Sequence, residues 1–338
     1  MVAESQRAKE LAILSILDEA DSPLSGAELE ARLQDKGYEL SERTIRLYLQ
    51  RFDAEGYTES CGKQGRKITD RGRLLLDEER LIHRVGYMSA RIDQMTYTMD
   101  FDLPRRKGTV VINLAIIKRE EFLRYLPQVE LVFEKGYAMG TLVSLLQEGE
   151  RLGSYTIPTG HIGFCTVCSV TLNGVFLKYG IPTRSLFSGL LQLEQGQARR
   201  FVELISYDGT SIDPLQLFIR GKMTDYLGAI RDGNGRIGAG FREIPGESYQ
   251  LAQDLARQLQ DIGLGAFLKI GRPSRDLLNV PVHEGCCGLI VIGGLNPVAV
   301  FEESGISVSY NALAGYMEFN RLFHYSQMRE RLLHYSPT

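Results

Sequence analysis

The stretch SERTIRLYLQRFDAEGY, residues 41–57, decides the fold of the N-terminal part of the chain. Ser41 is a candidate N-cap, because its hydroxyl oxygen can accept a hydrogen bond from a free backbone N–H of a first helical turn. At about 100° per residue, Ile45, Tyr48, Leu49 and Phe52 fall on one side of the helix that follows. The pattern therefore predicts an amphipathic helix over most of this stretch, with that side buried.

The opposite side of the predicted helix carries Arg43, Arg46, Leu47, Gln50 and Arg51. Arginine and glutamine side chains can form paired hydrogen bonds with guanine and adenine edges in the major groove of DNA. We therefore expect this side to be open to solvent and available to a duplex.

A shorter helix is predicted just upstream, in LSGAELEARLQDKG at residues 24–37. Ser25 and Glu28 occupy the two positions of a capping box, which satisfies free backbone N–H groups at a helix start. Gly37 is a plausible stop for this helix. Two short helices with a tight join, the second basic on its exposed side, are typical of a helix-turn-helix.

A basic hairpin is predicted next, in TESCGKQGRKITDRGRLLL at residues 58–76. Its two short strands, at 58–60 and 67–69, flank turn glycines Gly62 and Gly65. Between Lys63 and Arg73 there are five basic residues and one acid, a local balance of +4 in a chain of net charge −3. A basic hairpin beside a recognition helix can act as a wing that contacts phosphates or the minor groove.

These features together predict a winged helix-turn-helix domain over residues 1–78, with a further helix that begins near Asp70. Its expected partner is double-stranded DNA, bound by a homodimer that reads two half-sites. A protein-binding role for the same fold remains open. The residues expected to contact DNA are Arg43, Thr44, Arg46, Leu47, Gln50, Arg51, Lys63, Arg66 and Lys67.

The bulk composition is that of a globular protein: 43% of the 338 residues are apolar and 24% are charged. No apolar run reaches the roughly eighteen residues that a membrane span needs, so no membrane segment is expected. The five cysteines are an odd number, and the N-terminus lacks the pattern of a secretory signal. Both points predict a reducing compartment, the cytoplasm.

The remainder of the chain predicts a linker over 79–108 and an α/β (α+β) regulatory domain over 109–332. The segment TVVINLAII at 109–117 predicts a strand, and helices are expected at 118–126 and 140–147. The glycine clusters Gly233-Asn234-Gly235 and Gly238-Ala239-Gly240 predict tight turns rather than a nucleotide-binding loop.

This domain contains an internal repeat. IPTGHIGFCTVCSVTLNGVFLKYGI at 157–181 corresponds to VPVHEGCCGLIVIGGLNPVAVFEESGI at 280–306. Both segments carry a proline, a histidine, a cysteine pair, a Leu-Asn step and a final Gly-Ile. The strand candidates VVINLAII and FVELISY also correspond loosely. We therefore expect two lobes, about 109–200 and 201–332, related by a pseudo-twofold axis, with a ligand cleft between them.

The cysteines and histidines of the repeat leave two alternatives open. Cys165 and Cys168 with Cys286 and Cys287 could ligate zinc or supply a nucleophile, which would make the chain a Cys/His or zinc-dependent enzyme fused to a winged helix. Free cysteine is more often a buried core residue, and no third group that would orient a nucleophile is evident. We therefore predict no enzyme activity, no metal and no cofactor.

The quoted motifs resemble a known family. The head, with SERTIRLYLQRFDAEGY and GRKITDRGRLLL, and the repeat segments of the body are similar to the NrpR nitrogen regulatory repressors. The resemblance extends from about residue 8 to residue 325. It implies a ligand-responsive homodimeric repressor of nitrogen-assimilation genes, whose inducer is the small dicarboxylate 2-oxoglutarate.

The resemblance also directs the choice of effector residues to the repeat motif itself. A glycine-containing turn and polar side chains there suit a carboxylate ligand. The expected effector-binding residues are Gly160, His161, Cys165, Cys168, Thr171, Asn173, His283, Cys286 and Cys287.

Overall fold

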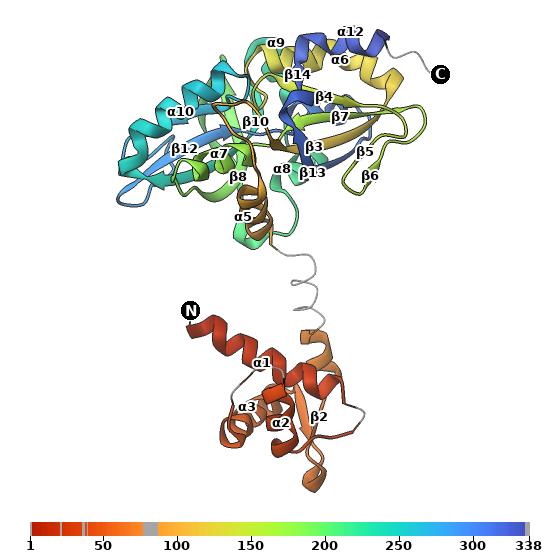
Figure 1. Cartoon of the computed structure of the whole chain (residues 1–338), viewed down its shortest axis with the longest axis vertical. Helices are drawn as coiled ribbons and strands as arrows, with labels where there is room; N and C mark the ends of the chain where they lie inside the picture. The colour runs from red at the N-terminus through yellow and green to blue at the C-terminus, as the bar shows by residue number, and fades with distance from the viewer. Residues whose placement is uncertain (1, 21, 36–37, 39, 77–86, 335–338) are drawn as a thin grey trace. The chain divides into compact units, whose positions relative to one another are not determined.

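The computed structural model divides the chain into two compact units, residues 1–86 and 87–338, which we describe separately (Figure 1). The residues that the structure describes are 2–20, 22–35, 38, 40–76 and 87–334. Two predictions, the helix stop at Gly37 and the first part of the linker at 79–86, lie outside the described residues.

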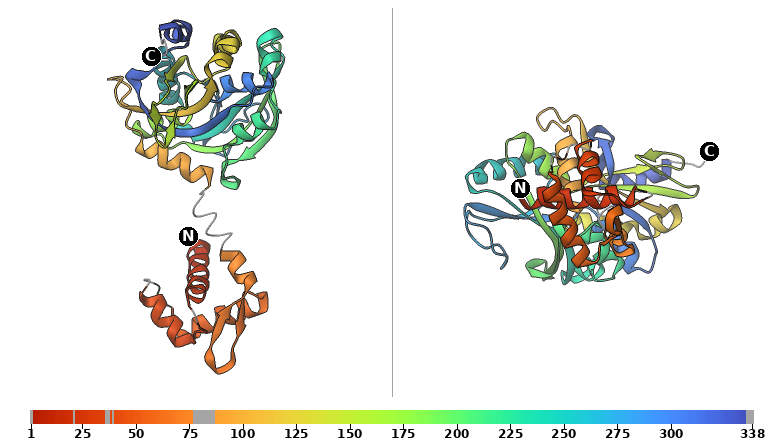
Figure 2. Two further views of the ribbon diagram at one scale, coloured as in Figure 1. Left: turned by 90° about the vertical axis from the view of Figure 1, so that its right-hand side faces the viewer. Right: turned by 90° about the horizontal axis from the view of Figure 1, so that it is seen from below.

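The first unit is a winged helix, as predicted. Its elements are α1 (Val2–Asp18), α2 (Gly26–Asp35), α3 (Glu42–Glu55), β1 (Thr58–Ser60), η1 (Gly62–Gln64) and β2 (Arg66–Ile68), followed by a helical segment at 70–76. The two strands pair antiparallel and project from the helices as a hairpin (Figure 2). The three helices and β2 enclose a core in which Ile13, Leu29, Ile45, Leu49 and Phe52 are buried.

Local side-chain chemistry explains where these helices begin. The Ser25 backbone N–H donates to Glu28 Oε2 at 2.8 Å, and the Glu28 N–H donates to Ser25 Oγ at 3.3 Å, which confirms the capping box. The same backbone hydrogen bond from Ser25 lowers the pKa of the Glu28 carboxyl. Ser41 Oγ accepts from the Thr44 N–H at 3.3 Å and caps α3 as predicted.

Gly65 fixes the position of the hairpin on the helices. Its φ of 109° is unfavourable for other residues, and a Cβ there would lie 2.1 Å from the Leu24 carbonyl oxygen. The adjacent Arg66 exchanges two backbone hydrogen bonds of 2.9 Å with Leu24. Only glycine therefore allows the wing to pair with the segment before α2.

The second unit contains two five-stranded antiparallel sheets, ordered β13-β3-β7-β4-β14 and β11-β12-β10-β8-β9. The strands of the first sheet are β3 (Thr109–Lys118), β4 (Leu142–Leu146), β7 (His161–Val167), β13 (Ser309–Glu318) and β14 (Phe323–His324). The strands of the second are β8 (Arg184–Glu194), β9 (Gln197–Ser206), β10 (Gly235–Pro245), β11 (Phe267–Ile270) and β12 (Cys286–Ile292). A separate hairpin is formed by β5 (Arg151–Leu152) and β6 (Tyr155–Thr156).

Helices connect and cover these strands (Figures 1 and 2). They are α5 (Met88–Thr98), α6 (Arg119–Glu134), α7 (Val170–Lys178), α8 (Pro214–Arg220), α9 (Tyr226–Asp232), α10 (Tyr249–Asp261), α11 (Ala299–Glu303) and α12 (Met328–His334). None of the helices in the described part of the chain is both long and apolar enough to cross a bilayer.

The internal repeat is confirmed by the topology. The order β3-α6-β4-β7-α7-β8 recurs as β10-α10-β11-β12-α11-β13. The last strand of each repeat joins the sheet of the other, so that β8 pairs with β10 and β13 pairs with β3. The repeats are therefore interlocked rather than merely adjacent.

This exchange corrects the predicted lobes. Because β8 belongs to the second sheet and β13 to the first, lobes at about 109–200 and 201–332 are not the spatial units of the domain. The counterpart of β3 is β10. It is not the segment FVELISY at 201–207, most of which lies in the edge strand β9. Sequence similarity located the repeat but not the partner of each strand, because strand pairing is a long-range property.

Three local predictions are also wrong. Residues 87–108 are not a linker: Met88, Ile92 and Phe101 are buried in the domain core, and α5 packs against α7. The predicted helix over 140–147 is strand β4 instead. Gly238-Ala239-Gly240 is the centre of β10, where a Cβ on Gly238 would lie 2.3 Å from the Leu215 side chain. Close packing, not a turn, requires glycine there.

Candidate DNA interface and effector site

Helix α3 presents four of the predicted DNA-contacting residues to solvent. Arg43, Arg46, Leu47 and Gln50 are exposed, while Ile45 and its neighbours on the other side are buried. The arginine-bearing side of the helix is thus open, as the sequence predicted.

The two exposed arginines of α3 differ in whether an acidic side chain pairs with them. Arg46 Nη2 lies 2.6 Å from Glu42 Oε1, an exposed pair one helical turn apart. Arg43 has no ion pair within the described part of the chain. Thr44 is half-buried, and its hydroxyl lies 3.0 Å from Ser41 Oγ, so it serves the helix cap. Arg43 is therefore the cation most available to an incoming anion.

Arg51 departs from its predicted role. Its guanidinium lies 2.6 Å from Glu10 Oε1 and packs over the rings of Tyr48 and Phe52, 5.6 and 5.4 Å from their centroids. The hydrogen bond to Glu10 raises the pKa of Arg51. The ion pair with Glu10 therefore joins α3 to α1. The contacts with the two aromatic rings hold the guanidinium away from the exposed side of α3.

The wing is less free than its charge suggested. Arg66 Nε donates to Asp53 Oδ2 at 2.8 Å, and the same carboxylate accepts from Thr58 Oγ1 at 2.5 Å, which ties both strands to α3. Lys67 forms a cross-strand pair of 2.7 Å with Glu59. Lys63, in the turn of the hairpin, is exposed. Of the three predicted wing contacts, Lys63 is the one best placed for a phosphate.

The predicted effector residues are not brought together. Strand β7 separates Gly160 and His161 at its start from Cys168 beyond its end, roughly 25 Å apart at about 3.3 Å per residue. Cys286 and Cys287 likewise lie at the start of β12. Residues that are close in sequence lie far apart when they follow one another along an extended strand, and the sequence argument did not take this into account.

Several of these residues have structural partners instead. Gly160 forms a turn with φ of 72° and donates its N–H to Glu148 at 3.1 Å. His161 Nδ1 lies 2.9 Å from the Thr159 carbonyl oxygen. Thr171 Oγ1 accepts from the Val111 N–H at 3.1 Å. His283 Nδ1 lies 2.8 Å from the buried carboxylate of Glu243.

Three of the predicted cysteines lie in environments that suppress thiolate formation. Burial raises the pKa of Cys165, raises that of Cys168 to about 12, and raises that of Cys287. A nucleophile or a zinc ligand must be a thiolate, so these environments disfavour both roles. Across the described residues no group of three or more His, Cys, Asp and Glu side chains could hold a metal ion.

A polar cavity, which we call the junction cavity, lies where the two repeats meet, beyond the ends of β7 and β12. A Cβ on Gly294, just after β12, would lie 2.4 Å from the Asn113 side chain and from the Val167 carbonyl oxygen, so the two repeats touch here. The cavity has a volume of about 30 Å³, room for a few water molecules. Its lining is Asn113, Cys168, Ser169, Ser188, Tyr207, Asp213, Leu215, Gly240, Gly293, Gly294, Leu295 and Ala312.

Arg242, on β10, is the most unusual charge beside this cavity. It is 2% exposed, and its guanidinium donates to Ser169 O at 2.9 Å, Ser169 Oγ at 2.7 Å and Asn173 Oδ1 at 2.5 Å. All three acceptors are neutral, and Arg242 Nε is buried without a partner among the described residues. A buried cation without a carboxylate is costly unless an anion compensates it. Burial accordingly lowers its pKa.

Asp213 contributes a titratable carboxyl to the same cavity. It caps α8 by accepting from the N–H groups of Leu215 and Gln216, at 2.9 and 3.2 Å. Burial nevertheless raises its pKa to about 6, and burial also raises the pKa of the neighbouring Tyr207. Sequence reasoning missed this group and Arg242; the available signal was the Arg242-Glu243 pair in a strand whose one other charged residue is Arg236, near its start.

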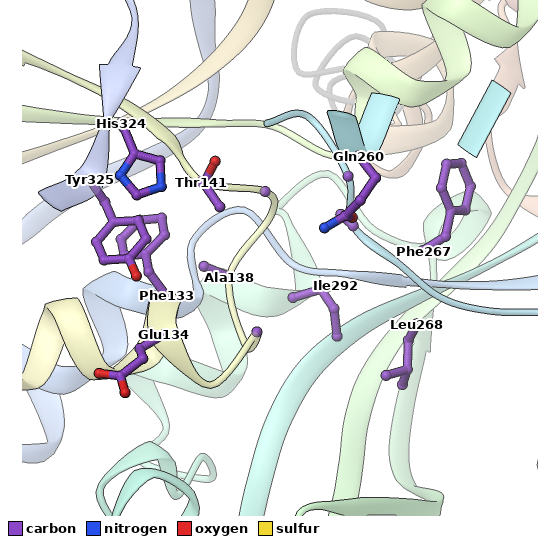
Figure 3. Close-up of a pocket in the computed structure, with 14 residues that line it drawn as sticks. Phe133, Glu134, Ala138, Thr141, Gln260, Phe267, Leu268, Ile292, His324 and Tyr325 are labelled. Atoms are coloured by element: carbon purple, nitrogen blue, oxygen red, sulfur yellow. The ribbon is translucent and has the colours of Figure 1, made fainter. Parts of the chain in front are cut away.

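A larger pocket, of about 440 Å³, lies at a different part of the contact between repeats (Figure 3). It is bordered by Phe133, Thr141, Gln260, Phe267 and Tyr325, and backbone hydrogen bonding from Thr141 N to Gly263 O at 2.9 Å joins the repeats beside it. No lysine or arginine is among the described residues that line it, and its carboxylate belongs to Glu134. Its size suits a ligand, but none of the described residues that line it accepts a hydrogen bond from a buried guanidinium, as Ser169 does at the smaller cavity.

Comparison with known proteins agrees with this architecture. The sequence profile of the NrpR regulatory domains NRD1 and 2 matches residues 85–324, and that of the ribonuclease R winged-helix domain matches residues 11–76. The global nitrogen regulator NrpRI of Methanosarcina mazei is 31% identical over 314 residues, which are 93% of this chain and 97% of that protein.

Two further comparisons extend the picture. The global nitrogen regulator NrpR of Methanococcus maripaludis is 30% identical over 89% of this chain, which spans 52% of that longer protein. A crystal structure of a nitrogen repressor-like protein from Methanococcus jannaschii superposes with a TM-score of 0.60 over 71% of this chain and 98% of the other. At 23% identity, this last likeness shows the fold alone.

The winged helix with its open arginine face, joined to a two-repeat domain, is the architecture of a transcriptional regulator. The profile match covers most of the chain, and the relative from Methanosarcina mazei is matched over almost its whole length. The chain belongs to the NrpR family of nitrogen regulators, which confirms the resemblance found in the sequence.

Proposed function

We propose that this nitrogen regulator is a cytoplasmic, homodimeric repressor that binds operator DNA through α3 and the wing and has no enzyme activity. One observation carries the proposal: Arg43, Arg46, Leu47 and Gln50 share an exposed face of α3. A helix with this face fits the major groove, where arginine and glutamine can read base edges. Lys63 in the wing turn supplies a phosphate contact.

The DNA contacts of one subunit are few, since Arg51 and Arg66 hold the winged helix together. Strong operator binding then requires two subunits on two half-sites, whose spacing is set by the dimer. Light scattering on the full chain tests the dimer: a mass twice that of the 37.9 kDa chain supports it, and a monomeric mass at micromolar concentration contradicts it.

We further propose that 2-oxoglutarate binds at the junction cavity and relieves repression. Arg242 is a buried guanidinium with neutral partners, which a carboxylate would compensate, and Ser169 and Ser188 add hydroxyl groups nearby. Among the residues expected from the sequence, Cys168 lines this cavity and Asn173 accepts a hydrogen bond from Arg242. The cavity holds only a few water molecules, so the ligand must move the strand ends apart and favour a second arrangement of the repeats.

A series of contacts leads from this cavity to helix α5. Ser169, which accepts two hydrogen bonds from Arg242, is the N-cap of α7. Helix α7 packs against α5, where a Cβ on Gly174 would lie 2.4 Å from Met99 Cε. Helix α5 is the first helix of the second unit. A ligand that displaces Ser169 would therefore act on α5 through a tightly packed contact.

Calorimetric titration of the full chain with 2-oxoglutarate tests the effector. Saturable binding of one ligand per chain supports the proposal, and 2-oxobutyrate, which lacks the second carboxylate, should bind much more weakly. Equal binding of both acids, or no heat with either at millimolar concentration, contradicts it.

A further inference from the structure

Leu47 stands apart from the other apolar residues of helix α3. Its exposed fraction is 62%, although α3 buries three other apolar side chains. It does not pack against the core cluster of the first unit. Removal of a large apolar side chain from water by contact with another apolar group is favourable. Leu47 is therefore available for contact with an apolar group from outside this unit.

The neighbours of Leu47 indicate the kind of partner. Arg43 lies one turn before it and Gln50 lies one turn after it, so that the three side chains share one helical face. Arg43 is a cation without an ion pair among the described residues. An anionic partner that also offers an apolar group fits this face better than an apolar protein surface does.

The major groove of DNA has one such group. Among the four base edges, only thymine presents an apolar substituent in that groove, its C5 methyl. We infer that Leu47 is a specificity-determining residue that selects thymine by contact with this methyl. The inference rests on the proposed function and extends it from DNA binding to the identity of a base.

The helix geometry limits where that thymine lies. Arg43 and Gln50 are seven residues apart, roughly 10 Å at about 1.5 Å per residue. Base pairs are spaced by about 3.4 Å, so this face covers on the order of three base-pair steps. Each half-site therefore contains a thymine within about three base pairs of the base that Arg43 contacts.

Substitution of single thymines tests the inference without disturbing the protein. The full chain is used to select a duplex from a random library, and each thymine of that duplex is then replaced by deoxyuridine, which lacks only the methyl. Loss of one buried methyl is expected to weaken binding about fourfold at one position in each half-site. In the Leu47→Ala variant the thymine and deoxyuridine duplexes should bind equally.

Two variants serve as matched controls. Leu74, on the helical segment after the wing, is 64% exposed, and Leu74→Ala should keep the fourfold preference for thymine. Arg43→Ala should lower the affinity for the thymine and the deoxyuridine duplex alike, so that the ratio of the two affinities stays about fourfold. A preference that persists in Leu47→Ala overturns the inference, as does a duplex in which no thymine position is sensitive.

Other outcomes separate this inference from the function on which it rests. If the library yields no bound sequence, both the function and the inference fail. If the wild type binds a duplex but Leu47→Ala changes only the mass of the assembly, Leu47 contacts a second copy of the chain, and the thymine inference alone fails.

Discussion

Arg43 in the first unit and Arg242 in the second are both guanidinium groups without a carboxylate partner among the described residues. Arg43 is exposed on α3, whereas Arg242 is 2% exposed and bonded to Ser169 and Asn173. A duplex is a long polyanion that approaches from outside, so its cation stays at the surface. In the proposed function the small dianion would be enclosed by its site, and Arg242 is already held inside by neutral acceptors that an anion could displace.

The contrast predicts different consequences for the loss of each cation. The largest expected effect concerns Arg242. The variant Arg242→Met should lose about a hundredfold in affinity for 2-oxoglutarate, because truncation of a buried charge pair costs about 2–5 kcal/mol. Calorimetry measures it, with circular dichroism as the check that the variant folds. Arg236→Met, on the same strand and away from the cavity, is the matched control. Unchanged affinity in the Arg242 variant would remove this residue from the site.

The second prediction concerns the attachment of the wing. Asp53 accepts hydrogen bonds from Arg66 and Thr58, so Asp53→Ala should lower the unfolding free energy of the first unit by about 2 kcal/mol. Denaturant unfolding of the full chain measures this value. Asp70→Ala, whose carboxylate is fully exposed beside Arg73, should change it very little. Equal effects of the two substitutions would contradict the assigned role of Asp53.

The third prediction separates arginines that contact DNA from arginines that hold the fold. Arg43→Ala should weaken specific binding by about 1–3 kcal/mol, since it removes a base contact, and leave stability unchanged. Arg51→Ala should do the reverse, because Arg51 joins α3 to Glu10 on α1. Fluorescence anisotropy with a selected duplex and thermal unfolding measure the two quantities. Loss of DNA affinity in Arg51→Ala at temperatures where it is fully folded would reverse this assignment.

The smallest predicted effect is a pH dependence from Asp213. Its folded-state pKa of about 6 lies above the value near 3.9 of an unfolded aspartate, so the folded chain binds more protons between these two values. Stability should therefore fall as pH rises from about 4 to 7, by about 1 kcal/mol, since solvent screens this half-buried group. Asp213→Asn should abolish that slope. A stability that rises over this range through Asp213 would contradict the raised pKa.

Local sequence signals were enough to predict the first unit. The capping box of Ser25 and Glu28 and the N-cap Ser41 each act on residues close in sequence. Of the predicted contact residues, Arg51 and Arg66 are held by Glu10 and Asp53, and only tertiary structure brings these partners near.

The second unit was harder to predict, because its pattern is long-range. The repeat was visible, but the exchange of β8 and β13 between sheets has no local signature. Gly238 was interpreted as a turn residue, although its lack of a side chain allows Leu215 to pack against a strand. Arg242 and Ser169 are 73 residues apart in sequence and meet only in the folded domain.

The measurement that tests the account most directly is the affinity of the full chain for a selected duplex, with and without 2-oxoglutarate. Fluorescence anisotropy should show at least about tenfold weaker binding with saturating ligand, equivalent to roughly 1.4 kcal/mol of coupling between the junction cavity and α3. The Arg242→Met variant should bind the duplex equally well in both conditions. Unchanged affinity of the wild type in saturating 2-oxoglutarate would contradict the account.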